Sequence, residues 1–328
     1  MDTGTHFAMG VALGGIATLD PAVANDPTLF EAVFIGTIIG SQAPDIDTIF
    51  KLHNNATYIR SHRGFSHSLP AIFGWSLLIS TIIMLFMAEI SFFHLWKWTL
   101  IAVSFHVFVD LFNAYGTQAL RPFSNKWIAF DLIHTFDPFI FFMHLVGICG
   151  WLLGLSSGYL WLAIYFIILI YYWQRYMDRL AIVKKIHHNF PDAKKITTSP
   201  TTKQHFWRVA FMTETSFYVG TVKHGKLRIV DQFKREPLPD IPIIELAKQD
   251  KNIAAFLSFS PIYRWQISEY PHYTEVRLID LRYRKKDHYP FVAIVKIDQQ
   301  QNILCSFTGW VFSEQKLQRK LSIENSQL

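Results

Sequence analysis

Histidine and aspartate residues recur beside apolar segments in the first half of this 328-residue chain. An ionisable group near a membrane-spanning segment is costly to keep and therefore indicates a function. Asp45 and Asp47 stand two residues apart, and His106 and Asp110 have the spacing that places two side chains on one face of a helix. The candidate metal ligands are His6, Asp45, Asp47, His62, His67, His106, Asp110 and Asp137.

Imidazole and carboxylate ligands together suit Zn²⁺, Mn²⁺ or Fe²⁺ better than Ca²⁺. The two cysteines, Cys149 and Cys305, are too few for a thiolate zinc site. The set predicts one or two divalent ions, with Zn²⁺ favoured over Mn²⁺ or Fe²⁺. Such a site activates water and binds the oxygens of a phosphoester. Arg63 could pair with a phosphate, and Asp45 or Asp47 could act as a general base instead of a ligand.

The elements that must position these residues are apolar helices. Hydrophobic residues make up 51% of the chain and charged residues 17%, which excludes a disordered protein. A segment of about 20 apolar residues crosses the core of a bilayer. Spans are predicted at 69–88, at 96–112 and, as two helices joined by a turn, at 138–173. The stretches 6–19 and 29–40 could cross, re-enter or pack against the others, so we expect an all-α membrane bundle of four to six transmembrane helices.

Charge is divided sharply between the two halves. Residues 1–174 contain 6 Lys+Arg and 10 Asp+Glu, whereas residues 175–328 contain 25 and 15. In the first half, Lys and Arg gather in alternate connections, and the positive-inside rule assigns those connections to the cytoplasm. The sequence therefore predicts a multi-pass protein of the inner, cytoplasmic membrane with its C-terminal domain in the cytoplasm.

This topology brings the candidate ligands to one end of the bundle, although they are spread over about 130 residues of sequence. Each motif alone has a plainer explanation. The pair His106 and Asp110 could be a hydrogen bond between packed helices, and Asp45 and Asp47 could cap a turn. A lone histidine such as His144 is more often simply hydrogen-bonded. The shared depth of all the motifs favours a metal centre at the cytoplasmic membrane surface.

The order of the motifs resembles that of the YdjM family. It runs from His6 through Pro44-Asp45-Ile46-Asp47 and His62-Arg63-Gly64-Phe65-Ser66-His67-Ser68 to His106 and Asp110. Members are described as inner-membrane, metal-dependent hydrolases, and some are called LexA-binding. The soluble C-terminal part makes the chain similar to a YfhP-type member. The resemblance covers about residues 1–175, and more distantly the family is similar to zinc-dependent phospholipase C.

This resemblance implies a metal-dependent hydrolase domain at residues 1–175 and leaves the substrate open. It implies an ion held by the motif residues, to which the sequence pattern alone adds Asp137. The ligands implied by the family motifs are His6, Asp45, Asp47, His62, His67, His106 and Asp110.

The pattern changes in the second half. A basic juxtamembrane helix and linker are expected at 176–203, followed by a small β-rich α+β domain at 204–328. A helix is expected at 243–256, and the part of the chain after residue 203 has no phosphate-binding loop and no Ser-His-Asp set. Alternating apolar residues predict strands at 206–211, 216–222, 226–230, 264–267, 274–280, 291–297 and 303–308.

Basic and aromatic residues of this domain could contact anionic lipid or nucleic acid. Such residues more often form a solvated strand face, so membrane lipids are the favoured partner and nucleic acid is not expected. The sequence identifies no protein partner for the domain. The residues in question are Trp207, Arg208, Arg282, Tyr283, Arg284, Lys285 and Lys286.

Three hypotheses for function follow. The first is a membrane-bound metal-dependent hydrolase that acts on a phosphoester or lipid-like ester. The second is a non-enzymatic membrane protein with a structural metal, whose soluble domain recruits a partner. The third is a transporter, but this hypothesis requires polar residues at the bilayer midplane and inverted repeats. The polar residues gather at one end of the bundle instead, and the sequence has no evident repeat.

Overall fold

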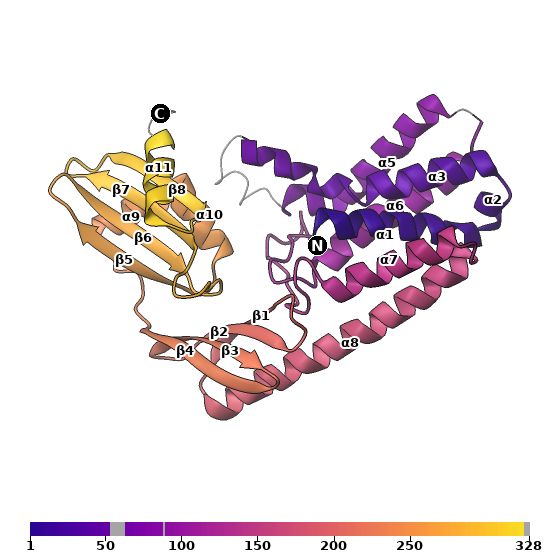
Figure 1. Ribbon diagram of the computed structural model, residues 1–328. Helices are drawn as coiled ribbons and strands as arrows, with labels where there is room; N and C mark the ends of the chain where they lie inside the picture. Colours follow the sequence, from indigo (N-terminus) through magenta and orange to yellow (C-terminus); the bar gives the residue numbers. More distant parts are fainter. Residues whose placement is uncertain (53–62, 88, 325–328) are drawn as a thin grey trace. The chain divides into compact units, whose positions relative to one another are not determined.

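The computed structural model describes residues 1–52, 63–87 and 89–324, which form two compact units (Figure 1). The first unit contains Met1–Asp47, residues 63–87 and 89–180, and Ser199–Gln204, whereas residues 48–52 are grouped with the second unit. The second contains Ala181–Thr198 and the chain from His205 onward. The first unit is helical and the second is rich in strands, so the fold class predicted from the sequence is confirmed.

Capping side chains begin most helices of the first unit. Asp2, Asp20, Asp26, Ser68 and Asp137 each accept a hydrogen bond from a backbone N–H of the turn that follows. Proline lies in the first turn after four of these caps, where a missing N–H costs no helical hydrogen bond. The elements are α1 Thr3–Ile16, η1 Ala17–Leu19, α2 Pro21–Ala24, α3 Pro27–Gly40, η2 Ala43–Leu52, η3 Phe65–His67, α5 Leu69–Phe86, α6 Phe92–Asp110, α7 Pro138–Leu152 and α8 Ser157–Asn189, where η marks a 3₁₀ helix.

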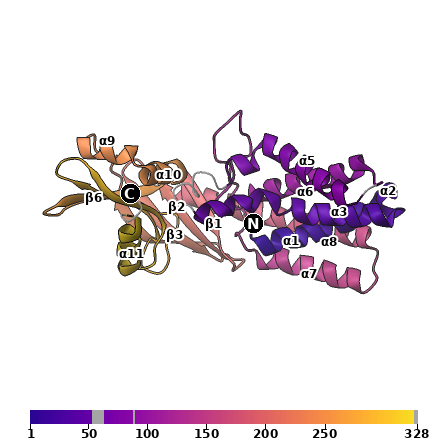
Figure 2. The ribbon, with the colours of Figure 1, turned by 90° about the horizontal axis from the view of Figure 1, so that it is seen from above.

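Glycine allows α3 to approach both α1 and α6 closely. A Cβ atom on Gly10 of α1 would lie 2.8 Å from the Cα atom of Ile38 in α3. A Cβ atom on Gly40 of α3 would lie 3.2 Å from the carbonyl oxygen of Thr99 in α6. Figure 2 shows α1 and α3 lying side by side. Small residues at such crossings are typical of membrane helices, because they bring two backbones together.

Three helices in the described part of the chain, α5, α6 and α8, are long and apolar enough to cross a membrane. The apolar helix α7 is shorter. Large apolar side chains such as Leu77 and Phe166 are exposed on the outer faces of α5 and α8. Such exposure suits contact with lipid. The expected spans 69–88, 96–112 and 138–173 correspond to α5, α6, and α7 with the first part of α8, and the stretches 6–19 and 29–40 correspond to α1 and α3.

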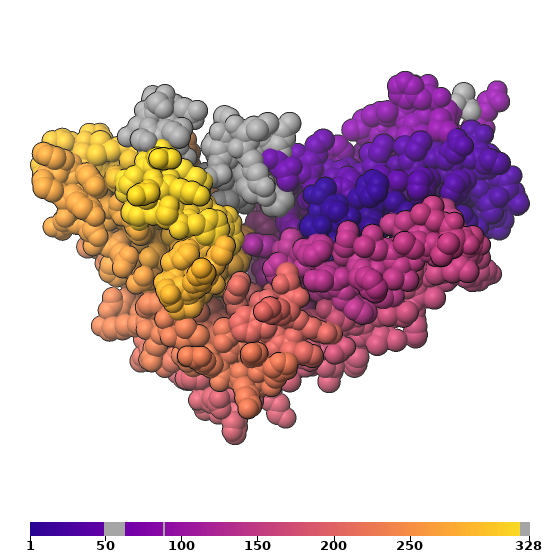
Figure 3. Space-filling view, viewed as in Figure 1, coloured from indigo at the N-terminus to yellow at the C-terminus, as the bar shows by residue number. Residues whose placement is uncertain are grey.

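Two four-stranded antiparallel sheets form the second unit, each with its strands in sequence order. Trp207 of the first sheet shares a core with Ile182 and Ile186 of α8. Met212 of this sheet joins Ile262 in a second core. Figure 3 shows the surface of the strand-rich part of the chain in orange to yellow. The elements are β1 Lys194–Pro200, β2 Phe206–Met212, β3 Ser216–Lys223, β4 Lys226–Lys234, α9 Pro242–Gln249, α10 Lys251–Phe259, β5 Tyr263–Glu269, β6 Tyr273–Asp280, β7 Phe291–Asp298, β8 Ile303–Trp310 and α11 Glu314–Glu324.

The second unit differs from the sequence-based expectation in three places. Strand β1 lies in the segment 176–203, where a helix and a linker were expected. Helix α11 was not predicted. The helix expected over 243–256 is two helices, because the carboxylate of Asp250 accepts hydrogen bonds from the backbone of Asn252 and Ile253 and starts α10.

Candidate metal centre

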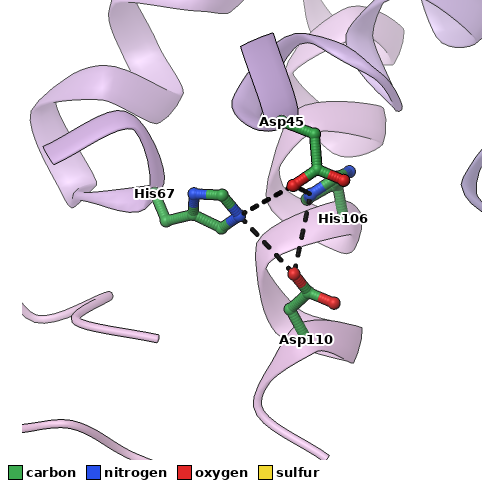
Figure 4. Close-up of side chains that lie close together, drawn as sticks. All are labelled: Asp45, His67, His106 and Asp110. Carbon is green, nitrogen blue, oxygen red and sulfur yellow. Dashed lines mark ion pairs between the residues drawn. The ribbon is translucent and has the colours of Figure 1, made fainter. Parts of the chain in front are cut away.

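Four of the predicted ligands come together at one end of the helical unit. Asp45, His67, His106 and Asp110 each offer one atom, and these four atoms all lie within 4.8 Å of one another (Figure 4). His67, His106 and Asp110 are buried, and Asp45 is partly buried. Asp45 and Asp110, which are 65 positions apart in the sequence, thus lie close together. The sequence predicts this, because it brings the candidate ligands to one end of the bundle.

The nitrogen and oxygen atoms alternate around this volume. Nε2 of His67 lies 3.8 Å from Oδ1 of Asp45 and 3.5 Å from Oδ2 of Asp110. Nε2 of His106 lies 3.7 Å from the same Asp45 oxygen and 3.8 Å from the same Asp110 oxygen. Separations of this size fit ligands that share an ion, because each would stand about 2.0–2.2 Å from a zinc centre.

Three short structural features hold the four side chains in place. The last two turns of α6 carry His106 and Asp110 on one face. Asp45 lies in η2, just after α3 ends at Gly40. His67 is the last residue of η3, and the next residue, Ser68, caps α5. Helix ends therefore supply all four side chains, and the packing of α3 against α6 brings those ends together.

Several of the converging atoms lack a hydrogen bond. Oδ1 of Asp45 and Nε2 of His106 are buried and have no hydrogen-bond partner among the residues that the structure describes, whereas Oδ2 of Asp110, which also accepts no hydrogen bond there, is ion-paired with Arg63. An unsatisfied buried polar atom costs about 1–3 kcal/mol, and more when it is charged. A divalent cation would satisfy all of them at once, and a set of two imidazoles and two carboxylates fits Zn²⁺, Mn²⁺ or Fe²⁺.

The hydrogen bonds of the imidazoles separate a ligand from an ordinary core histidine. Nδ1 of His106 lies 2.6 Å from the carbonyl oxygen of Ser41. A carbonyl only accepts, so Nδ1 carries the proton and Nε2 offers a lone pair to the other three side chains. His144 of α7 differs, because its Nδ1 faces the Ile140 carbonyl and its Nε2 faces the Tyr165 hydroxyl. It is the satisfied core residue that the sequence suggested.

The polar and charged groups around Asp45 keep it ionised. Burial alone would raise the pKa of this carboxyl group, but His106, His67 and Arg63 outweigh burial and lower the pKa well below its usual range. Asp45 therefore presents a carboxylate at physiological pH, which is the form that binds a cation. Its side chain is 14% exposed, whereas those of His67, His106 and Asp110 are at 0%, so the approach from solvent is on the Asp45 side.

Asp47 and Arg63 stand next to the four residues. Oδ2 of Asp47 accepts hydrogen bonds from the Ser66 hydroxyl at 2.6 Å and from the backbone N–H of Arg63 at 2.9 Å. Nη2 of Arg63 lies 3.2 Å from Oδ2 of Asp110, and its Nη1 donates to Oδ1 of Asn113 at 2.9 Å. The guanidinium that was expected to bind phosphate is thus engaged with the side chains around the cluster.

The other predicted ligands are not among these four residues. His6 stacks on His106 with ring centroids 3.6 Å apart, and its Nε2 lies 3.4 Å from Oδ1 of Asp110, the oxygen that faces away from the cluster. Asp137 caps α7 and accepts a hydrogen bond from the Tyr171 hydroxyl at 2.9 Å. His62 lies outside the described residues.

Sequence reasoning missed three residues that support the cluster. Ser41 supplies the carbonyl that binds His106, Ser66 bonds to Asp47 and faces His67, and Asn113 bonds to both Arg63 and Asp110. Ser66 lies inside the histidine motif, and Asn113 follows Asp110 by three residues, so proximity to a motif was the available signal. The contact with Ser41 could not be predicted from the sequence, because it is made by a backbone carbonyl, which every residue has.

Comparisons with known proteins agree with this architecture. Residues 1–182 match the family model of the YdjM inner membrane protein. Residues 191–233 match the YfhP middle domain, and residues 242–321 match the YfhP C-terminal alpha/beta plait domain. The chain is 56% identical over 324 residues to the uncharacterized protein YfhP of Bacillus subtilis (strain 168), covering 98% of this chain and 99% of that protein. No solved structure matches the chain.

Proposed function

This chain belongs to the YdjM family of inner membrane proteins, and on that premise we propose that it is a membrane-bound metal-dependent hydrolase. The family and the four-residue cluster fit a metal-binding membrane protein. The proposal adds a reaction, which is hydrolysis of a phosphoester or a lipid-like ester at the cytoplasmic membrane surface.

The observation that carries the proposal is the buried cluster of Asp45, His67, His106 and Asp110. These side chains would hold a divalent cation, with zinc favoured. When bound, the cation would activate water and polarise the ester. A substrate would enter at the partly exposed edge at Asp45, and if Asp45 acts as a general base instead of a ligand, it would take a proton from the attacking water while the other three side chains hold the ion.

The position of the cluster supports a substrate from the membrane surface. The cluster lies where α5 begins and α6 ends, and both of these helices are candidate membrane spans. In the sequence, the segments 41–68 and 113–137 carry Lys51, Arg60, Arg63, Arg121 and Lys126, and by the positive-inside rule this end of the bundle would face the cytoplasm. An amphiphile in the cytoplasmic leaflet would present its ester at this depth.

A structural metal site is the second candidate, and one observation favours it. Four protein ligands complete a tetrahedral zinc shell, whereas catalytic zinc sites usually keep one position open for water. In that case the soluble domain would recruit a protein partner, and the ion would hold η2, η3 and α6 together.

A metal analysis combined with a substrate panel separates the two candidates. The full-length protein, purified in detergent, is analysed for bound metal and assayed on phosphomonoester, phosphodiester, phospholipid and carboxyl ester substrates. For a hydrolase we expect one or two bound ions and turnover that His67→Ala and Asp45→Ala abolish, while His144→Ala retains it. Bound metal without turnover of any substrate, together with unfolding on metal removal, would support the structural site instead.

A further inference from the structure

We propose that Ser66 is a positioning residue of the metal centre. Its hydroxyl links the carboxylate of Asp47 to the imidazole of His67 and fixes the tautomer in which Nε2 of His67 faces the other ligands. This inference rests on the proposed metal centre, but it does not require that the centre be catalytic.

The geometry is that of a three-membered relay. Oγ of Ser66 lies 2.6 Å from Oδ2 of Asp47 and 2.9 Å from Nδ1 of His67. The direct distance from Nδ1 of His67 to Oδ2 of Asp47 is 3.8 Å, which is too long for a hydrogen bond. The serine hydroxyl therefore bridges a gap that the carboxylate cannot close alone.

The number of hydrogens fixes the direction of the relay. A serine hydroxyl has one hydrogen to donate, and an ionised carboxylate can only accept. Ser66 must therefore donate to Asp47 and accept from His67, which requires a proton on Nδ1 of His67. The neutral imidazole then has its lone pair on Nε2, the atom that lies 3.5 Å from Asp110 and 3.8 Å from Asp45.

The carboxylate end of the relay is itself held in place. Oδ2 of Asp47 also accepts the backbone N–H of Arg63 at 2.9 Å, and Asp47 is 3% exposed. Arg63 adopts a left-handed backbone conformation with φ of 60°, which residues other than glycine rarely adopt. The backbone at Arg63 thus helps fix Asp47, and Asp47 acts on His67 through Ser66.

The two histidines of the cluster reach the same tautomer by different routes. Nδ1 of His106 donates to the neutral carbonyl of Ser41, whereas Nδ1 of His67 donates through Ser66 to a carboxylate. A carboxylate behind a metal-binding imidazole orients the ring and raises its basicity. The relay therefore orients the His67 ring through a carboxylate, and in it Asp47 acts beside the cluster instead of in it.

The test is the affinity of the full-length protein for Zn²⁺ and Co²⁺, measured by chelator competition in detergent. Ser66→Ala should weaken binding by about 10–100-fold, the usual cost of losing an outer partner of a ligand. Ser66→Thr keeps the hydroxyl and should restore most of the affinity. Ser68→Ala is the matched control, because Ser68 belongs to the same motif but caps α5, and it should leave the affinity unchanged.

Two further readouts separate the relay from a general loss of structure. The visible spectrum of the Co²⁺ protein should change in Ser66→Ala and stay unchanged in Ser68→Ala. In a double-mutant cycle, Ser66→Ala and Asp47→Ala together should weaken binding no more than the stronger single change, because both break one relay.

Equal metal affinities for Ser66→Ala and Ser68→Ala would overturn the relay, as would additive losses for Ser66 and Asp47. Failure of the proposed hydrolase gives a different result, namely wild-type protein that binds metal without turning over any substrate. If the wild-type protein binds neither Zn²⁺ nor Co²⁺, the proposed metal centre is refuted, and so is the proposed role of Ser66.

Discussion

Nε2 of His106 lies 3.8 Å from Oδ2 of Asp110, one turn further along α6. A single helix thus supplies two of the four donors, and its regular backbone places both residues on one face, where the Ser41 carbonyl orients the His106 ring. The other two donors come from η2 and η3, whose positions depend on packing. The α6 pair is therefore the fixed half of the candidate centre.

Loss of His106 should remove most metal binding. His106→Ala leaves three donors, so the Zn²⁺ affinity should fall by more than the roughly 10–100-fold that an outer partner is worth. His144→Ala is the control, because this buried histidine of α7 has both ring nitrogens engaged away from the cluster. Chelator competition on purified protein measures both. Equal Zn²⁺ affinities of His106→Ala and His144→Ala would show that His106 is not a ligand.

Asp137 should matter for stability and not for metal binding. Its carboxylate caps α7 and accepts the Tyr171 hydroxyl, so Asp137→Ala should cost about 1–2 kcal/mol and lower the melting temperature. Tyr171→Phe removes one of these bonds and should cost less. If Asp137→Ala instead lowers the Zn²⁺ affinity tenfold or more, then this residue is a ligand and the arrangement described above is wrong.

The close approach of α1 and α3 should make Gly10 intolerant of substitution. A Cβ atom there would meet the Ile38 Cα atom at 2.8 Å, so Gly10→Ala must push the helices apart at a cost of about 1–3 kcal/mol. Gly74 of α5 has nothing within 4 Å of its ideal Cβ position, and Gly74→Ala should be neutral or slightly stabilising. Thermal unfolding in detergent compares the two. Similar melting temperatures would contradict the packing.

A pH-dependent contribution to stability is expected from Asp231 in β4. Burial alone would raise the pKa of this carboxyl group, but hydrogen bonds from Tyr289 at 2.5 Å and Arg284 at 2.6 Å outweigh burial and lower the pKa. Because folding favours the ionised form, the contribution is full above the unfolded pKa of about 4 and is lost as the pH falls through the lower, folded pKa.

Asp231→Asn should therefore destabilise the protein by about 1 kcal/mol at pH 7, and the difference from wild type should shrink below about pH 4. Asp287→Asn is the matched control, because Asp287 also faces Arg284 but its side chain is fully exposed. Melting temperatures from pH 3 to pH 8 test the expectation. A deficit that grows on acidification would reverse the assigned sign.

Much of the fold could be read from the sequence, because its signals are local. Apolar segments predicted the membrane helices, and alternating apolar residues predicted β2 to β8. Strand β1 was missed because Lys194–Pro200 begins with two lysines and ends with proline, a composition that reads equally as a linker. Helix α11 was missed because it is short and mostly polar.

The candidate site could be predicted as a set but not in its detail. Shared depth in the bundle brought together Asp45, His67, His106 and Asp110. It did not separate Asp45 from Asp47, because that difference arises from the 3₁₀ geometry of η2. Three residues per turn send side chains two positions apart in different directions. An aspartate before proline can be a ligand or a cap, and for Asp137 the structure shows a cap of α7 together with a hydrogen bond from Tyr171.

Helix α8 has a consequence for how this protein can be divided. One uninterrupted helix of 33 residues contributes to both units, and its last turns place Ile182 and Ile186 beneath Trp207. A recombinant fragment that starts at residue 204 would lack β1 and the side chains that cover this tryptophan. The C-terminal half therefore cannot be cut off at residue 204 without uncovering part of its hydrophobic core. A fusion of this half to a different membrane helix would have to keep α8 from Ala181 onward, because the hydrophobic core of the second unit begins there.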